Sequence, residues 1–581
     1  MKKIFKGIFT GIKNSLERFP QTIGISAICV IILIYTSEIR PEASNDLIET
    51  LGRVTMVIAL GIPLSVSIKL FFERLDNYKK ISLYATYLGS TVLLIIYYYL
   101  FLQDIAMVSM SRYIGFSLIL YLIFLFISYL PNRNDFEFFA VRVFTRFFTT
   151  ILYSLVLYLG LAAILFTIDK LLGVNIESEL YYYTFLVVAG IFAPSFFLAG
   201  IKAKDEILTI KEYSRLLMVL VLYIIMPLIS IYTIILYIYF GKIIITRQWP
   251  EGLVSNLVLW YSAITSAVLF FISPLLHEMA WPRRYMKYFP KAIIPLIVMM
   301  FISIGIRINA YGVTENRYYV VALGIWVLLV MIYFSTTKKL TNIILPISLA
   351  LITTISVFGP LSSYSISKYS QNKRLNEIFA KNNMIQDNKV IKASAEVPDE
   401  DSRHITSIVN YFDRNHSLRD VKGLPKDFKT TDMERILGVK YSAENYQNDY
   451  GYYYFNSIGS AEPIEISGYD YLFISRNNGE QTAESKTFGM NFDNELSTLK
   501  ITKDKNIVYK RNLMDFANKL IDKYGTNQNN QSLSQKEMVF MDGNDKVEIK
   551  IQFLHLSGNK NTSRDKMESK YFEFYILVKF K

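Results

Sequence analysis

The distribution of charged residues is the feature that most constrains the fold of this chain. Between Gln21 and Pro360 the sequence contains about eleven apolar stretches with very few charges, and after Pro360 such stretches end. A helix needs roughly 20 mostly apolar residues to cross the hydrocarbon core of a bilayer. The sequence therefore predicts an α-helical polytopic membrane domain followed by a sizeable water-soluble domain.

The connections between the apolar stretches carry an uneven share of the basic residues. One set of alternate connections holds 21 Lys and Arg and the other holds 8. Loops rich in Lys and Arg stay in the cytoplasm, so the N-terminus is predicted to be cytoplasmic and the C-terminal domain extracytoplasmic. The predicted spans are 21–37, 54–72, 81–102, 113–130, 147–167, 181–200, 216–240, 257–276, 292–307, 318–335 and 342–359.

The composition narrows the class of protein further. The net charge is +13, but the basic residues of the first half lie in short loops between apolar segments, which suits membrane topology better than nucleic-acid binding. One cysteine, Cys29, and four histidines do not favour a disulfide or a transition-metal site. No Walker loop, dinucleotide fingerprint or GxSxG motif is present, so no cofactor is predicted.

Four regions follow from this pattern. Residues 1–20 are predicted to form a cytoplasmic amphipathic interfacial helix, because apolar residues recur near helical spacing among lysines. Residues 21–360 form the transmembrane domain, 361–395 a helical stalk or linker, and 396–581 an extracytoplasmic α+β domain. The stretch 135–146 mixes aromatic residues with arginines and is expected to lie along the inner membrane surface.

The soluble domain shows both helical and strand periodicity. Amphipathic helices are predicted over 399–414 and 513–524, where apolar residues recur at helical spacing. Strands are predicted at 469–475, 547–556 and 571–579, and the last two alternate apolar and polar residues. We expect these two strands to be antiparallel neighbours in a sheet, joined by the polar loop between them.

The densest group of candidate site residues lies between the ninth and tenth predicted spans, in RINAYGVTENRYY. It contains Arg307, Tyr311, Glu315 and Arg317. Guanidinium groups are suited to bidentate contact with phosphate or carboxylate, so these residues are candidates for binding an anionic group. In the alternative, structural interpretation, Glu315 pairs with an arginine and braces the hairpin against the soluble domain.

Other loops offer weaker candidates. Lys242, Arg247 and Trp249 are predicted to lie on the same side of the membrane and could share a pocket with the arginines, or Trp249 could be an interfacial belt residue beside solvated charges. The first outer loop carries the acidic residues Glu38, Glu42, Asp46 and Glu49. An acidic residue in this loop resembles lipid-linked membrane glycosyltransferases, where such a carboxylate acts as a base or metal ligand, but the loop is short and lacks a paired acidic motif. In the alternative interpretation it is a solvated acidic loop. His277 and Glu278 do not form an HExxH zinc motif, because position 281 is Trp281.

The motif RINAYGVTENRYY, followed by Trp326, resembles the signature of a bacterial membrane family catalogued as domain of unknown function number 4153. The apolar pattern over about residues 20–360 and the stretch GYDYLFIS are also similar to that family. The resemblance implies a multi-span bacterial membrane protein. It implies no established chemistry and no catalytic residue.

Three functional hypotheses remain open. The favoured one is a non-enzymatic protein of the bacterial cell membrane that binds an anionic lipid, a cell-wall polymer or another envelope protein at its outer face. The second is a membrane-embedded transferase that uses a lipid-linked donor. The third is a transporter or scramblase, although the spans carry almost no ionisable residues near the membrane midplane and are expected to be a packed apolar scaffold.

Overall fold

The structure is a computed structural model that divides the chain into two compact units. The first unit comprises Met1–Lys381 and Phe412–Lys426, and the second comprises Asn382–Tyr411 and Asp427–Lys581. The residues that the structure describes are 2–40, 43–75, 78–130, 135–174, 176–201, 213–246, 253–387, 389–439, 450–458, 464–475, 481–484, 487–493, 497–524, 531–561 and 566–581.

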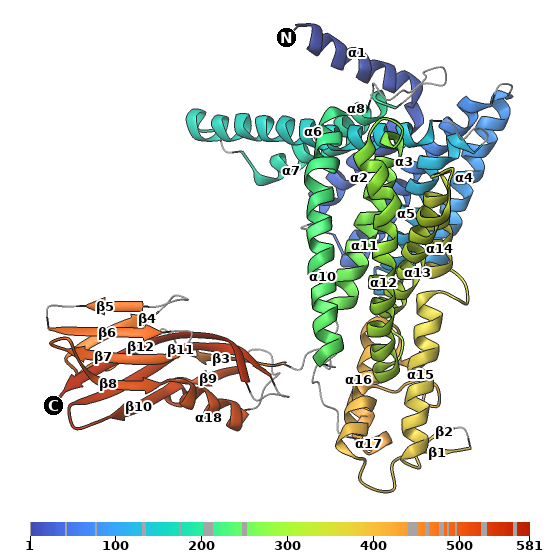
Figure 1. Ribbon diagram of the computed structural model, residues 1–581. Coiled ribbons are helices and arrows are strands. Elements are labelled where there is room, and N and C mark those ends of the chain that lie inside the picture. The colour runs from blue at the N-terminus through green and yellow to red at the C-terminus, as the bar shows by residue number, and fades with distance from the viewer. Residues whose placement is uncertain are drawn as a thin grey trace. The chain divides into compact units, whose positions relative to one another are not determined.

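The first unit is built from helices (Figure 1). Two of its helical runs contain a π-helical turn, at Val188–Phe192 and Leu220–Ile225. The helices are α1 (Lys2–Arg18), α2 (Pro20–Ile39), α3 (Asn45–Arg74), α4 (Lys80–Phe101), α5 (Met107–Phe126), α6 (Phe136–Leu172), α7 (Ser178–Val187), α8 (Ala193–Ala199), α9 (Arg215–Val219), α10 (Met226–Thr246), α11 (Leu253–Ile272), α12 (Ala280–Tyr311), α13 (Glu315–Thr336), α14 (Ile344–Val357) and α15 (Ser363–Lys381).

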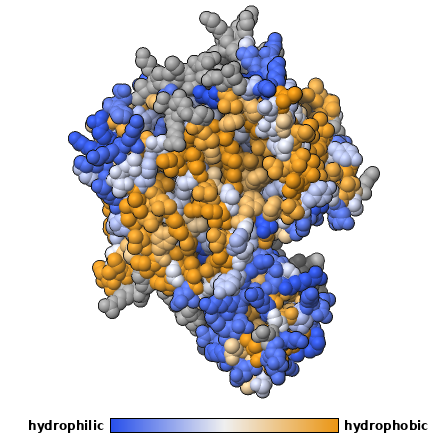
Figure 2. Space-filling model, turned by 90° about the vertical axis from the view of Figure 1, so that its right-hand side faces the viewer, coloured by the Kyte–Doolittle hydropathy of each residue, from blue (hydrophilic) through white to orange (hydrophobic). Residues whose placement is uncertain are grey.

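These helices confirm the predicted membrane domain. Ten helical segments among the described residues are long and apolar enough to cross a membrane, and the shorter apolar helix α14 covers the eleventh predicted span. Large apolar side chains cover their outer surface: on α4, for example, Ile81 is 78% exposed and Leu88 is 69% exposed. Figure 2 shows apolar residues spread over a broad band of the face in view. Such a surface is stable only in contact with lipid or another apolar partner.

Helix α6 differs from its prediction. The stretch 135–146, expected to be a separate interfacial segment, and the span 147–167 form one continuous helix of 37 residues, Phe136–Leu172. Neither proline nor glycine interrupts this sequence before Gly160, so nothing in it ends the helix earlier. Figure 1 shows α6 running at a steep angle to α10. None of its most apolar 18-residue window is buried within the protein.

The largest apolar core of the first unit lies among α10, α11, α12, α13 and the start of α14. Met226, Leu269, Ile293 and Val327 are fully buried there, one from each of the first four helices. Helices α12 and α13 form an antiparallel hairpin, and their short connection lies next to α15 through the hydrogen bonds described below. This core fixes the position of the α12–α13 connection.

The second unit is mixed α and β. Its larger sheet has the order β4-β12-β11-β3-β9, with β10 also paired to β11, and its second sheet has the order β5-β6-β7-β8. The described pairs are antiparallel except β3 with β9, which is parallel. The elements are β1 (Ile385–Gln386), β2 (Lys389–Val390), α16 (Asp399–Asn415, whose last residues belong to the first unit), α17 (Met433–Leu437), β3 (Tyr450–Ile458), β4 (Tyr471–Ser475), β5 (Gln481–Glu484), β6 (Phe488–Asp493), β7 (Thr498–Lys503), β8 (Asn506–Asn512), α18 (Met514–Tyr524), β9 (Gln531–Ser534), β10 (Val539–Gly543), β11 (Val547–Asn561) and β12 (Lys566–Phe580).

The strand pattern confirms the predicted α+β fold with an antiparallel sheet. Strands β11 and β12 are antiparallel neighbours, with Ile549 opposite Val578 and Ile551 opposite Ile576. All four side chains are fully buried, together with the apolar residues of α18. The alternation in the sequence therefore identified the inward face of both strands.

Candidate anion-binding site

The candidate loop is a tight reversal between α12 and α13. Helix α12 ends at Tyr311, and Gly312 follows with a φ of 71°, a backbone conformation that glycine adopts without a steric penalty. Helix α13 begins at Glu315. The N–H of Val313 donates to the Ser370 hydroxyl of α15 at 2.9 Å.

Helix α15 holds this loop through a buried glutamine. The Nε2 atom of Gln371 donates to the carbonyl oxygens of Tyr311 at 3.2 Å and Val313 at 2.9 Å. The side chain lies so close to Gly312 that a Cβ atom there would stand 3.0 Å from Nε2 of Gln371. The stalk helix predicted from the sequence is therefore also a structural support of the loop.

Arg317 caps the C-terminal end of α12. Its Nη1 atom donates to the carbonyl oxygens of Tyr311 at 3.2 Å and Gly312 at 2.7 Å. Its guanidinium carbon lies 5.5 Å from the centre of the Tyr311 ring. A cation at this end of a helix interacts favourably with the helix dipole. Arg317 therefore has a structural role, and only part of its donor set is used by the loop.

Two further arginines surround Arg317. Arg307 of α12 and Arg374 of α15 are partly buried, and both act electrostatically on the Arg317 guanidinium. Neither forms an ion pair with a carboxylate among the described residues. Burial lowers the pKa of Arg374, while the Glu377 carboxylate and Tyr311 act in the opposite direction. The three partly buried guanidinium groups thus concentrate positive charge at the loop.

Glu315 has a partner that the sequence did not suggest. Its Oε1 atom lies 2.7 Å from Nε2 of His416, and the two side chains are only 9% and 2% exposed. His416 belongs to the segment 412–426 of the same unit, which follows α16. The alternative interpretation expected Glu315 to pair with an arginine, but its partner is a histidine. Nothing in the sequence around His416, just after an amphipathic helix, indicated a contact with Glu315.

The segment 412–426 is also bonded to α15. Lys368 forms an ion pair with Asp420 at 3.2 Å. The Nδ2 atom of Asn372 donates to the Asp420 carbonyl oxygen at 2.9 Å, and the N–H of Lys422 donates to Oδ1 of Asn372 at 2.8 Å. The loop, α15 and this segment therefore form one hydrogen-bonded support behind the arginines.

The structure says less about the other candidate binding residues, Tyr311, Lys242, Arg247 and Trp249. Tyr311 is 46% exposed beside Arg317. Lys242 is exposed on α10, and the described contacts of the α12–α13 loop do not include it. Arg247 and Trp249 lie outside the described residues, so a pocket shared with the arginines stays a prediction.

The acidic residues of the first outer loop do not converge on a site in the part of the chain that the structure describes. Glu38 accepts a hydrogen bond from the Tyr183 hydroxyl at 2.6 Å, and Asp46 lies in the first turn of α3. Glu42 is outside the described residues. No group of three or more His, Cys, Asp and Glu within the described ranges could hold a metal ion.

Apolar helices of this number and a soluble α+β unit define a multi-pass membrane protein. The chain belongs to the family described as "domain of unknown function (DUF4153)", whose model matches residues 25–394. It is similar to an uncharacterised protein, PM1469, of Pasteurella multocida (strain Pm70), with 23% identity over 432 residues, 72% of this chain and 70% of the relative. No solved structure matches it. The family match includes the α12–α13 loop and α15 but ends before most of the second unit.

Proposed function

We propose that this protein binds an anionic group, a phosphate or carboxylate of an envelope lipid, where the end of α12 and the start of α13 meet the middle of α15. The observation that carries the proposal is the group Arg307, Arg317 and Arg374. The guanidinium groups of Arg307 and Arg374 both act electrostatically on that of Arg317, and among the described residues none of the three forms an ion pair with a carboxylate. A partly desolvated cation without an ion-pair partner costs free energy, which a bound anion would offset.

The position of the loop supports a site that is built before the ligand arrives. Arg317 is held by two backbone carbonyls, and the loop is held by Gln371 and Ser370. A preorganised arginine loses little conformational entropy when an anion binds. Arg307 and Arg374 then supply guanidinium donors, which have no hydrogen-bond acceptor within the described ranges.

We also propose that this site faces the extracytoplasmic side of a bacterial cell membrane. The support is the distribution of basic residues, with 21 Lys and Arg in one set of connections and 8 in the set that contains Arg307 and Arg317. On that side, an anionic phospholipid headgroup or a phosphate-bearing cell-wall polymer would present the chemistry that the arginines recognise.

A titration with soluble ligands tests the proposal. Purified protein in an uncharged detergent is titrated with dioctanoyl phosphatidylglycerol, dioctanoyl phosphatidylcholine and inorganic phosphate, and binding is followed by microscale thermophoresis. Saturable binding of the phosphatidylglycerol but not the phosphatidylcholine is expected. Equal binding of inorganic phosphate would assign the site to a phosphate group without its lipid. Binding of none of the three, or equal binding of both lipids, would contradict the proposal.

Variants connect the binding to the site. Arg307→Gln and Arg374→Gln are each expected to weaken phosphatidylglycerol binding by about tenfold, equivalent to about 1.4 kcal/mol. Lys339→Gln is the matched control, since Lys339 is an exposed cation in the α13–α14 connection. Arg317 is not the first choice, because its loss would also remove the hydrogen bonds at the end of α12.

A further inference from the structure

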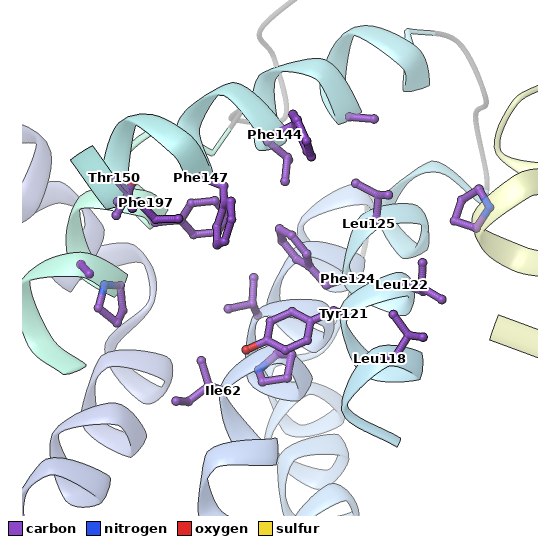
Figure 3. A pocket seen from close by; sticks show the side chains of 18 of the residues that line it. Ile62, Leu118, Tyr121, Leu122, Phe124, Leu125, Phe144, Phe147, Thr150 and Phe197 are labelled. Atoms are coloured by element: carbon purple, nitrogen blue, oxygen red, sulfur yellow. The ribbon is translucent and has the colours of Figure 1, made fainter. Parts of the chain in front are cut away.

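The first unit contains a large apolar pocket between α6 and the helices α3, α5, α11, α13 and α14. Figure 3 shows some of the side chains that α3, α5 and α6 contribute to its lining. Its volume is about 1330 Å³. It is partly open to its surroundings: Phe147 of α6 and Trp260 of α11 both line it and are 49% and 63% exposed. The sequence predicted a packed apolar scaffold here, so the pocket is a departure from that expectation.

Small residues explain why the pocket is hollow. Helix α11 presents Ala263 and Ala267, one turn apart, between the larger Trp260 and Phe270. The π-helical turn after α7 contributes Ala189. Close-packed protein interiors leave few voids larger than a water molecule, so a space of this size among membrane-crossing helices is a candidate for occupation.

The lining determines what can enter. Among the described residues that line the pocket, none is charged, and most are apolar or aromatic. Burying an ion or an unpaired polar solute in such surroundings costs several kcal/mol or more. Apolar cavities also stay dry unless they offer water several polar partners. A hydrocarbon chain fits this apolar lining. The acyl chains of the lipids around the membrane-crossing helices are a ready source of such a chain.

Two hydroxyl groups that line the pocket have no hydrogen-bond partner in the part of the chain that the structure describes. Thr150 and Ser154 lie one turn apart on α6, both line the pocket, and their Oγ atoms are buried without a hydrogen bond. Thr150 is only 5% exposed and is labelled in Figure 3. By contrast, Thr149 and Thr167 of the same helix donate to the carbonyl four residues earlier. Buried polar groups are normally paired, so these two hydroxyls can donate to a ligand oxygen without breaking a hydrogen bond to another described residue.

We propose that the pocket binds the hydrocarbon chain of a membrane phospholipid, and that Thr150 and Ser154 donate hydrogen bonds to the ester carbonyl at the head of that chain. The acyl chain makes van der Waals contacts in the space that the small side chains of Ala263 and Ala267 leave open. The ester carbonyl oxygen accepts hydrogen bonds from the two hydroxyl groups. This site shares no residue with the arginine group, so it does not depend on the proposed function.

A buried tryptophan reports on occupation of the pocket. Trp326 lines the pocket and is only 9% exposed, whereas Trp260 and Trp281 are 63% and 52% exposed. A variant carrying Trp249→Phe, Trp260→Phe and Trp281→Phe keeps Trp326 as its one tryptophan. It is reconstituted in vesicles of phosphatidylcholine with brominated acyl chains, which quench tryptophan fluorescence on close approach. Strong quenching relative to unbrominated vesicles is expected.

Filling the pocket provides the decisive comparison. Ala267→Phe in the same background is expected to reduce the quenching at least twofold, and Thr150→Val is expected to reduce it less. The matched control is Ala163→Phe, at an exposed position of α6 outside the pocket. If Ala267→Phe does not fold, Ala267→Leu takes its place. The proposal would be overturned if Trp326 showed no quenching, or if Ala267→Phe or Ala267→Leu left the quenching unchanged. A change from dimer to monomer in Ala267→Phe would also overturn it, because the pocket would then be assigned to a second copy of the protein.

Discussion

Glu315 and His416 meet 2.7 Å apart although 101 residues separate them in the sequence. Glu315 begins α13, and His416 follows directly after α16. Both side chains are almost completely buried. The contact fixes the first turn of α13, two residues before Arg317, and so links the segment 412–426 to the proposed anion site.

This contact predicts a measurable stability coupling. His416→Ala and Glu315→Ala each remove one partner and leave the other buried without it, which typically costs about 1–3 kcal/mol. The double variant is expected to be less destabilised than the sum of the single variants, because the interaction is lost only once. Thermal unfolding of the detergent-solubilised protein measures the three apparent Tm shifts.

The control for this coupling is the ion pair between Lys368 and Asp420. Both side chains are 37% exposed, and ion pairs of that exposure contribute about 0–1 kcal/mol. Lys368→Gln is therefore expected to change the apparent Tm much less than His416→Ala. Strict additivity of the Glu315 and His416 substitutions would show that the two side chains do not interact.

The turn between α12 and α13 predicts a contrast between two glycines of the same region. Gly312→Ala places a Cβ at a φ of 71° and 3.0 Å from Gln371, so a loss of about 1–2 kcal/mol is expected. Gly305→Ala lies inside α12 with nothing within 4 Å of its Cβ, so about 0.5–1 kcal/mol of stabilisation is expected. Unfolding midpoints compare the two; equal shifts would argue against the observed turn.

Periodicity explains which parts of the fold the sequence predicts. The alternation of Ile549 and Ile551 with polar residues identified β11, its inward face and its antiparallel partner, because each strand carries its own pattern. Arg307 and Arg317, which lie on either side of the α12–α13 turn, were likewise visible as charges between apolar spans. Arg374 and His416 were not, since Arg374 is one polar residue in a mixed helix, His416 is one polar residue just after a helix, and the role of each depends on a distant loop.

His555 of β11 predicts a pH dependence of stability. Its ring nitrogens lie 2.7 Å from Oδ1 of Asn456 and 2.9 Å from the Ser557 hydroxyl, and burial lowers its pKa from 6.5. The unfolded chain therefore binds a proton more readily than the folded one as the pH falls below 6.5, and stability decreases in that range. At higher pH both states are neutral and His555 contributes no pH dependence.

The measurement is the apparent Tm of the full chain between pH 8 and pH 5. In His555→Gln the decrease in Tm below pH 6.5 is expected to be smaller than in the wild type, although the variant is less stable throughout. His404→Gln controls for removal of a histidine elsewhere in the chain. A steeper decrease in His555→Gln than in the wild type would contradict the direction of the pKa shift.

The proposed topology predicts a labelling pattern. In a Cys29→Ser background, Lys510→Cys on β8 is expected to react with a small membrane-impermeant maleimide in intact cells. Lys339→Cys, between α13 and α14, is expected to react only after the membrane is permeabilised. Both lysines are exposed, so accessibility depends on the side of the membrane. The reverse pattern would place the second unit in the cytoplasm.

The apolar pocket shows what hydropathy alone leaves undetermined. Ala263, Ala267 and Thr150 fit an apolar span as well as larger residues do, so the sequence predicted solid packing. Whether small residues meet across a space depends on the crossing of helices, which no single span encodes. In this protein the space lies beside α6, which runs at a steep angle to α10.

The most direct test of the proposed anion site is native mass spectrometry of the protein purified from its membrane in a mild detergent. The wild type is expected to retain anionic phospholipid in preference to zwitterionic phospholipid, and Arg307→Gln combined with Arg374→Gln is expected to lose that preference. The Lys339→Gln variant should behave as the wild type. A wild type without the preference, or a double variant that keeps it, would contradict the proposed binding of an anionic group by these arginines.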